Sequence, residues 1–381
     1  MPLDYETLRV LWWLLLGLVL IGFAVMDGFD LGVGMLLPWV ARDDTERRVV
    51  INSIGPVWEG NQVWLILGAG AAFAAWPPLY ATAFSGFYVA LFLVLVALIL
   101  RPVGFDFRSK VDSLRWRKMW DAALFLAGFV PTLIFGVAFG NLLQGVPFHF
   151  DEELRVTYTG DFLFHLLNPF ALLTGLVSLA MLAMHGAVYL VIKTEDEIER
   201  RARRAVRVAA PAVLVLFTLC GLWAAFGLDG YVIVSGAAHD AASNPLAKTV
   251  RTEPGAWLGN YARHPWMLLA PALAYAGAVA AFLLVRAGRP GLAFLGSAAC
   301  VLGIVSTAGL SMFPFLMPSS SDLRSSLTVW DASSSRLTLF VMLVASVVVL
   351  PIIASYTLFV YRVLRGKVTS RDIEERGHSL Y

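Results

Sequence analysis

Charge and cysteine are both scarce in this sequence. Only 15% of its 381 residues are Asp, Glu, Lys or Arg, whereas soluble domains carry about 25%, and 59% of the residues are hydrophobic. The two cysteines, Cys220 and Cys300, lie in apolar runs, so we expect neither a disulfide framework nor a metal site. The net charge is only +2 and the basic residues lie in short loops and not on one patch, so nothing indicates a nucleic-acid partner and we expect none. This composition indicates an integral membrane protein.

Long apolar runs make up much of the sequence. Nine of them can cross the ~30 Å hydrocarbon core of a bilayer. They predict an all-α, polytopic fold, one integral membrane domain over 1–381 with two four-helix blocks (8–142 and 162–316) and a ninth helix. The second run is the shortest, because a Trp-Pro-Pro break ends it at 76–78. The predicted spans are 8–38, 60–76, 79–101, 119–142, 162–192, 207–227, 264–285, 291–316 and 336–364.

The basic residues indicate how these spans are oriented. With the N-terminus outside, the cytoplasmic connections and the C-terminal tail hold 22 of the 29 Lys and Arg residues. A wrong number of spans would distribute the basic residues over both sides of the membrane. We therefore expect nine transmembrane helices, an outer N-terminus and a cytoplasmic C-terminus.

Two carboxylates, Asp27 and Asp30, lie inside the first apolar run. At 1.5 Å per residue they fall toward its cytoplasmic end, and a spacing of three residues places them on one helix face. An ionisable group in a bilayer costs at least ~2.5–3.5 kcal/mol on insertion scales, which favours a functional role for a buried acid. The alternative is a helix that ends near Asp27, with both acids at headgroup level. The apolar run continues through 31–40, which argues against it.

A further acid, Glu59, opens the second predicted span. It can be an ordinary first-turn acid that the helix dipole favours. Its neighbours Trp58, Asn61, Gln62 and Trp64 favour a second interpretation, in which acids and amides at one depth hold a file of water for proton entry.

The histidines and one Arg–Asp motif carry less information. Of six histidines only His185 lies well inside a span, no two are spaced i,i+4, and no Cys-x-x-Cys-His sequence occurs. We therefore expect His185 to be a hydrogen-bonded core residue and the chain to ligate no haem by itself. The stretch from Arg101 to Asp106 predicts a helix end with a neighbouring Arg–Asp pair.

Several long motifs resemble a known family. They cover essentially the whole chain, and some exceed eight contiguous residues, so chance similarity is negligible. The sequence is similar to subunit II of the cytochrome bd quinol oxidases. The motifs are GFAVMDGFDLGVGM at 22–35, IGPVWEGNQVWL at 54–65, FSGFY at 84–88, RPVGFDFR at 101–108, GVAFGNLLQGVP at 136–147, MFPFLMPSS at 312–320 and WDAS at 330–333.

The resemblance implies a heterodimer in the bacterial cytoplasmic (inner) membrane. A partner, subunit I, would carry the b-type haems, the d-type haem and the quinol-oxidising loop, and subunit II would have a pseudo-symmetric nine-helix fold. Asp27 and Glu59 match the family's proposed proton-pathway acids, although some members carry Asp at the second position. Lipid, quinol, small single-helix subunits and a structural quinone are further implied partners, but no residue here identifies a cofactor site.

A secondary transporter that binds a cation through Asp27 and Glu59 is the rival interpretation. Transporters of that kind often show inverted repeats and helices broken at the midplane. This sequence shows no compelling internal symmetry and no paired central breaks, which favours the oxidase subunit.

Overall fold

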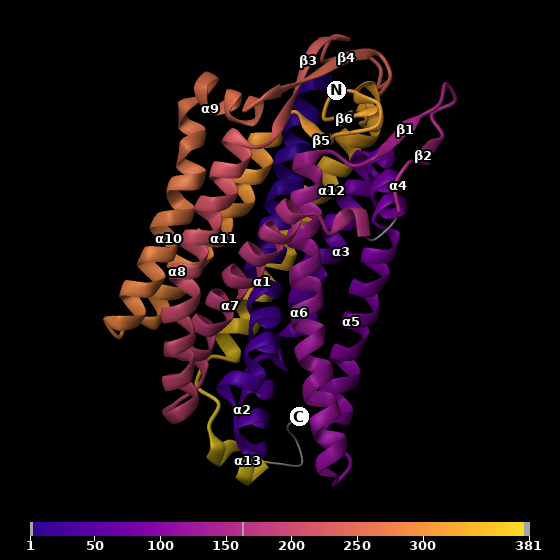
Figure 1. The fold of residues 1–381 in the computed structure, drawn as a ribbon. Helices are drawn as coiled ribbons and strands as arrows, with labels where there is room; N and C mark the ends of the chain where they lie inside the picture. The colour runs from indigo at the N-terminus through magenta and orange to yellow at the C-terminus, as the bar shows by residue number, and fades with distance from the viewer. Residues whose placement is uncertain (1–2, 162–163, 377–381) are drawn as a thin grey trace.

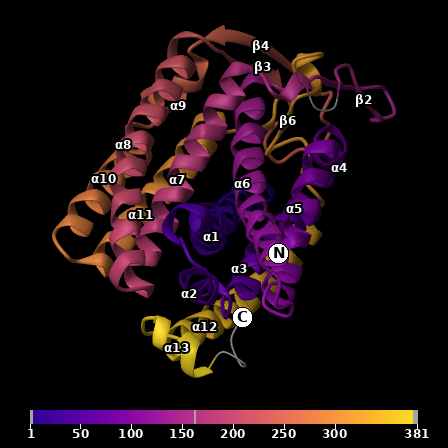
Figure 2. The ribbon, with the colours of Figure 1, turned by 60° about the horizontal axis from the view of Figure 1, so that its bottom comes forward.

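The computed structural model describes residues 3–161 and 164–376 and is a bundle of long helices around α1 (Figures 1 and 2). The predicted start of the fifth span at 162–163 and the end of the C-terminal tail lie outside the described residues. The helices are α1 (Tyr5–Val40), α2 (Asp44–Ile54), α3 (Trp58–Ala75), α4 (Pro77–Gly86), α5 (Tyr88–Phe107), α6 (Leu114–Gln144), α7 (Pro169–Lys193), α8 (Asp196–Phe226), α9 (Gly259–Arg263), α10 (Leu269–Arg286), α11 (Pro290–Met312), α12 (Arg336–Val363) and α13 (Ser370–Arg376).

Eight of the described helices are long and apolar enough to cross a membrane, namely α1, α5, α6, α7, α8, α10 with the 3₁₀ turn before it, α11 and α12. The all-α membrane fold is thus confirmed, whereas the count of nine is not. The second predicted span corresponds to α3, which has 18 residues and packs against α1 and α12 but is not among the eight.

The first and third predicted spans differ in how well they match the helices. The first is one unbroken helix from Tyr5 to Val40, so the alternative of a helix that ends near Asp27 is wrong. The prediction of a single helix over 79–101 is also wrong. The helix is interrupted at Phe87, between α4 and α5, and α5 then continues to Phe107.

The connections gather at two ends of the bundle (Figure 1). One, here called the α2 end, holds α2, α13 and the short connections 108–113, 194–195 and 287–289. The other, the hairpin end, holds the described start of the chain and three two-stranded antiparallel sheets. Their strands are β1 (Phe148–Phe150) with β2 (Val156–Tyr158), β3 (Asp229–Gly236) with β4 (Lys248–Pro254), and β5 (Phe315–Met317) with β6 (Leu327–Thr328).

Glycines let α1 approach its neighbours closely. A Cβ atom on Gly32 would lie 2.0 Å from the backbone oxygen of Leu182 in α7, and one on Gly128 of α6 would lie 2.4 Å from the oxygen of Leu31. The helix backbones therefore touch where these glycines meet. The glycine-rich segment after Asp27 serves packing, and it holds α1 at the centre of the bundle.

A buried arginine ties the first turns of α1 to distant segments. Arg9 is fully buried, stacks on the Tyr5 ring at 3.6 Å and donates to Ser333 Oγ (2.7 Å) and Ser243 Oγ (3.0 Å). It also donates to the carbonyl oxygen of Ala241 at 3.0 Å. One guanidinium thus holds together α1, the β3–β4 connection and the segment before α12.

Candidate functional site

Asp27 of α1 forms a buried ion pair with Arg101 of α5. Asp27 Oδ1 lies 2.6 Å from Arg101 Nη1, and the two side chains are 0% and 4% exposed. Both helices are candidate membrane spans, so the pair lies where water is scarce. Removing two charges from water is costly, and a close pair offsets much of that cost only with good geometry.

Asp30 begins a second set of contacts on the same face of α1. Asn61 of α3 donates from Nδ2 to Asp30 Oδ2 at 2.7 Å, and Tyr361 of α12 donates to Asn61 Oδ1 at 2.8 Å. Asp30 and Asn61 are buried, whereas Tyr361 is half-buried. Asn61 thereby links Asp30 of α1 to Tyr361 of α12.

The site has more acceptors than donors. Asp27 Oδ2, Asp30 Oδ1 and Arg101 Nη2 are buried and have no hydrogen-bond partner among the described residues. One guanidinium faces two carboxylates, so the group is neutral when it holds one proton. Burying an uncompensated charge costs free energy, so the net negative charge of the group favours the binding of a proton at this site.

A small cavity adjoins the site on the side of α2. Its volume of about 20 Å³ is enough for about one water molecule. Asp30 and Arg101 supply its polar lining, and apolar residues of α1, α2, α5 and α6 complete it. The cavity thus extends from the acids toward the α2 end. Its lining includes Val33, Leu37, Val50, Ile51, Ile54, Phe105 and Leu124.

Two tryptophans of α3, Trp58 and Trp64, pack near the site and make no hydrogen bond with the acids. Trp58 lies under Arg101, with the guanidinium carbon 5.9 Å from the ring centroid, and stacks on Phe105. Trp64 lies against α1 at Gly22, where a Cβ atom would be 2.6 Å from its ring. The Trp58 ring thus covers one side of the Arg101 guanidinium, whereas Trp64 packs α3 against α1.

Glu59 lies outside this group of direct contacts, and the file of water predicted there stays a prediction. Glu59 is exposed and has no hydrogen bond or ion pair with a described residue, and the half-exposed Gln62 has no hydrogen bond with one either. Helical geometry explains the difference, because Trp58 and Asn61 are three residues apart and face inward together. Glu59 instead begins an outward stripe that continues at Val63, which is 37% exposed.

The sequence motif predicted the wrong partner for Arg101. The predicted pair with Asp106 does not form: Asp106 is exposed, and α5 continues through Pro102 to Phe107 instead of ending. Residues three or four apart face each other on a helix, whereas a spacing of five separates them. An arginine in an apolar run, with buried acids on another span, was the available signal.

His185 is a core residue, as predicted. The ring is fully buried, with Nδ1 2.8 Å from Ser297 Oγ of α11 and Nε2 2.9 Å from the carbonyl oxygen of Val25 of α1. Both nitrogens are engaged with protein atoms, so neither points into space that an iron could occupy. The residues 3–161 and 164–376 also contain no group of three or more His, Cys, Asp or Glu suited to a metal ion.

Comparison with known proteins identifies the family. A family model described as cytochrome bd terminal oxidase subunit II matches residues 8–364. The chain belongs to this family. Membership confirms the resemblance found in the motifs and favours an oxidoreductase subunit over a transporter.

Relatives of the cytochrome bd subunit II family match over their full length. The chain is 55% identical to cytochrome bd-I ubiquinol oxidase subunit 2 of Escherichia coli (strain K12) and 51% identical to a probable cytochrome oxidase subunit 2 of Haemophilus influenzae, each over 100% of both chains. Cytochrome bd ubiquinol oxidase subunit 2 of Bacillus subtilis is 31% identical, over 96% of this chain and 98% of its own. These relatives and the apolar helices indicate a multi-pass protein of the bacterial inner membrane.

A solved structure shares the fold. A chain of the bd oxidase from Geobacillus thermodenitrificans superimposes with a TM-score of 0.68 and 19% identity, over 94% of this chain and 99% of that chain. The bundle around α1 is therefore the architecture of a bd oxidase chain.

Proposed function

We propose that this chain is the haem-free subunit of a quinol:O₂ oxidoreductase. The complex oxidises ubiquinol or menaquinol and reduces O₂ to water, and subunit I carries the b-type and d-type haems. The engaged nitrogens of His185 support this division, because they leave the one fully buried histidine among the described residues without a free ligand atom. When bound in the partner, the haems supply electron transfer and oxygen reduction, and this chain supplies protons and support.

The proton role rests on one observation, the buried group of two carboxylates and one guanidinium. In this proposal a proton reaches Asp30 Oδ1 from the cavity on the α2 side and passes to Asp27 Oδ2, both of which are unpaired acceptors. Arg101 offsets one of the two carboxylate charges, so the group is neutral while it holds a proton and carries one negative charge after the proton has left. Because protons consumed at oxygen come from the cytoplasm and quinol releases its protons outside, the reaction generates a proton motive force without pumping.

Glu59 takes a separate place in this scheme. It lies on the outward stripe of α3, so it acts at the boundary with another subunit or with lipid and not within the bundle. Trp58 and Asn61, on the inward face, connect that boundary to the buried acids.

Orientation and span number follow from the charge pattern. We propose that α3 is the ninth transmembrane helix, that the α2 end faces the cytoplasm and that the N-terminus lies outside. The connections with most basic residues gather at the α2 end, which agrees with the positive-inside rule (Figure 1). Pseudo-symmetry with subunit I, small single-helix subunits and a structural quinone belong to the same proposal.

The test uses Asp30→Asn in the assembled complex. Asn keeps the shape and the contact with Asn61 but cannot carry a proton. Oxygen consumption with quinol should fall while the visible haem spectrum stays intact, and the loss should grow as pH rises, because protons then become scarce. Asp106→Asn, at an exposed acid on α5, is the matched control. Normal turnover of Asp30→Asn at every pH would show that the acid is structural, and a purified complex without haem would refute the oxidase assignment.

A further inference from the structure

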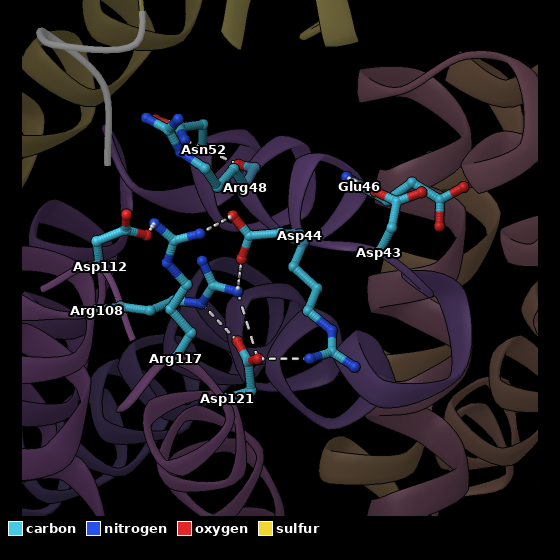
Figure 3. Close-up of polar contacts among 10 residues, drawn as sticks. Asp43, Asp44, Glu46, Arg48, Asn52, Arg108, Asp112, Arg117 and Asp121 are labelled. Atoms are coloured by element: carbon cyan, nitrogen blue, oxygen red, sulfur yellow. Dashed lines mark hydrogen bonds and ion pairs between the residues drawn. The ribbon is translucent and has the colours of Figure 1, made fainter. Parts of the chain in front are cut away.

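The arginines at the α2 end differ in whether an acid balances their charge. Those around α2 lie among aspartates, and Arg108 and Arg117, for instance, both pair with Asp44 (Figure 3). On α8 and α10, by contrast, Arg207 and Arg286 are exposed and have no ion pair with any of the described residues. These two arginines are cations without a counter-charge in the described chain.

The sequence explains why no acid of these helices balances them. The chain has no Asp or Glu in 200–228 or in 254–321, which cover α8 after its first turn, α10 and α11. Glu199, the acid directly before the first of these stretches, pairs with Arg203 at 2.6 Å and with Lys367 at 2.8 Å. The acid of α8 that is nearest in sequence to Arg207 thus already serves two other cations.

Arg207 and Arg286 lie at the same depth on neighbouring helices. α8 and α10 pack side by side and antiparallel (Figures 1 and 2), and the hydroxyl groups of Thr218 and Tyr275 are 2.8 Å apart across their contact. Arg207 precedes Thr218 by about three turns, and Arg286 follows Tyr275 by about three turns. A whole number of turns also keeps each arginine on the helix face that carries the hydroxyl group. The two arginines therefore lie beside each other along the α8–α10 contact.

Local contacts hold this end of the two helices together. Arg203 Nη1 donates to the carbonyl oxygen of Val285 at 2.6 Å, and the Arg286 guanidinium lies over the Phe282 ring, 5.5 Å from its centroid. Two like charges at one depth repel each other, more strongly near hydrocarbon than in water. An anion between Arg207 and Arg286 would offset that repulsion.

The surface next to the two arginines is apolar, which decides between kinds of anion. The part of α8 over 208–226 is about 28 Å long, close to the hydrocarbon thickness of a bilayer, so Arg207 lies at the level of the lipid phosphates. From that level toward the hairpin end, Leu283 of α10 and Val215 of α8 are 54% and 58% exposed. A free phosphate ion makes no use of such a surface, whereas the acyl chains of a phospholipid cover it.

We propose that Arg207 and Arg286 bind the phosphate group of an anionic phospholipid in the leaflet at the α2 end. Each guanidinium donates to phosphate oxygens, and the acyl chains extend toward the hairpin end along α8 and α10. Arginine suits this ligand because its planar fork offers phosphate two donors, and basic sites between transmembrane helices hold anionic headgroups. The site is separate from the buried acids Asp27 and Asp30, so neither role depends on the other.

The experiment uses the assembled complex, stripped of lipid and incubated with phosphatidylcholine vesicles containing phosphatidylglycerol. Native mass spectrometry then counts the phosphatidylglycerol retained. The Arg207→Gln/Arg286→Gln double variant should retain about tenfold less than the unsubstituted complex. Lys110→Gln/Arg115→Gln removes two charges from exposed positions at the same end of the molecule and should retain the normal amount. Arg207→Lys/Arg286→Lys, which keeps the charges without the forks, should lie between them.

Four results would overturn the proposal. Normal retention by Arg207→Gln/Arg286→Gln would show that these arginines hold no lipid, and equal loss in both double Gln variants would show charge attraction without a site. Displacement of the lipid by inorganic phosphate, against chloride at equal ionic strength, would make free phosphate the ligand. Release of the partner subunit with lipid retained would make this face a protein contact. If the double variant does not assemble, photoactivatable phosphatidylglycerol on the unsubstituted complex decides, because labelling outside 203–218 and 275–289 refutes the site.

Discussion

At the scale of single residues, Arg101 governs the buried acids. It pairs with Asp27, lies over Trp58 and lines the cavity next to Asp30. One cation thus offsets the charge of two carboxylates. We therefore expect its removal to destabilise the fold more than the loss of either acid.

Arg101→Gln should destabilise the complex by about 3–5 kcal/mol, the usual cost of breaking a buried ion pair by removing one partner. Thermal unfolding of the assembled complex, followed by haem absorbance, measures the change. Arg115→Gln, at an exposed position of α6, should leave the unfolding temperature unchanged. An unchanged midpoint for Arg101→Gln would mean that water reaches the pair.

Tyr361→Phe tests the contact between α12 and the acid site. It removes the donor to Asn61 Oδ1, at a cost of about 1 kcal/mol, and frees the amide that holds Asp30. The infrared carboxyl band of Asp30, identified by its absence in Asp30→Asn, should shift in this variant. Tyr356→Phe, on the same helix but 63% exposed, should leave the band in place. A constant band in both variants would show that Asn61 orients Asp30 unaided.

The acids of this site could be predicted from the sequence, but their partners could not. An acid in an apolar run is conspicuous, so Asp27 and Asp30 were predicted to be buried and are buried. Arg101 is 74 residues from Asp27, and only tertiary packing joins them. The outward position of Glu59 depends on the rotation of α3, which its nearly uniform apolar composition does not determine.

At the scale of helices, the position of α1 depends on close backbone contact. α1 packs on α3, α6, α7 and α11, so the helix that carries the acids is held on several sides. Its two acids therefore have a fixed orientation toward α3 and α5.

Gly32→Ala should destabilise the bundle by about 1–3 kcal/mol, because the new methyl group meets the Leu182 carbonyl oxygen at the α1–α7 contact. Gly17→Ala lies on the same helix with nothing within 4 Å of the added Cβ, and helix propensity predicts no loss there. Chemical denaturation of the two variants compares the costs. Equal stability would show that α1 and α7 can move apart without penalty.

Helix ends were less predictable than helices. Apolar run length located every helix that is able to span, but it missed the break at Phe87, since the residues on both sides are apolar. It also ended the third span at residue 101, whereas α5 passes Pro102 because its neighbours fix the helix on both sides of the proline.

At the scale of the whole molecule, the two ends should face opposite compartments. Single cysteines at Lys110 (α2 end) and Ala238 (hairpin end) test this with a membrane-impermeant maleimide. The natural thiols, Cys220 and Cys300, are buried and give a low background. Ala238→Cys should react in cells whose inner membrane is intact, and Lys110→Cys only after that membrane is opened. The reverse pattern would invert the proposed orientation.

The contacts of Arg9 have a consequence for synthesis of the chain in the cell. Its partner Ser333 lies 324 residues downstream, and Trp12 likewise donates to the carbonyl oxygen of Leu339. At roughly 5–20 residues per second, translation reaches those partners tens of seconds after α1 has left the ribosome. Until then the guanidinium of Arg9 has the Tyr5 ring of its own helix and, once the β3–β4 connection has been made, Ala241 and Ser243 as partners, but not Ser333. The hydrogen bonds of α1 are therefore complete only after the start of α12 has been synthesised.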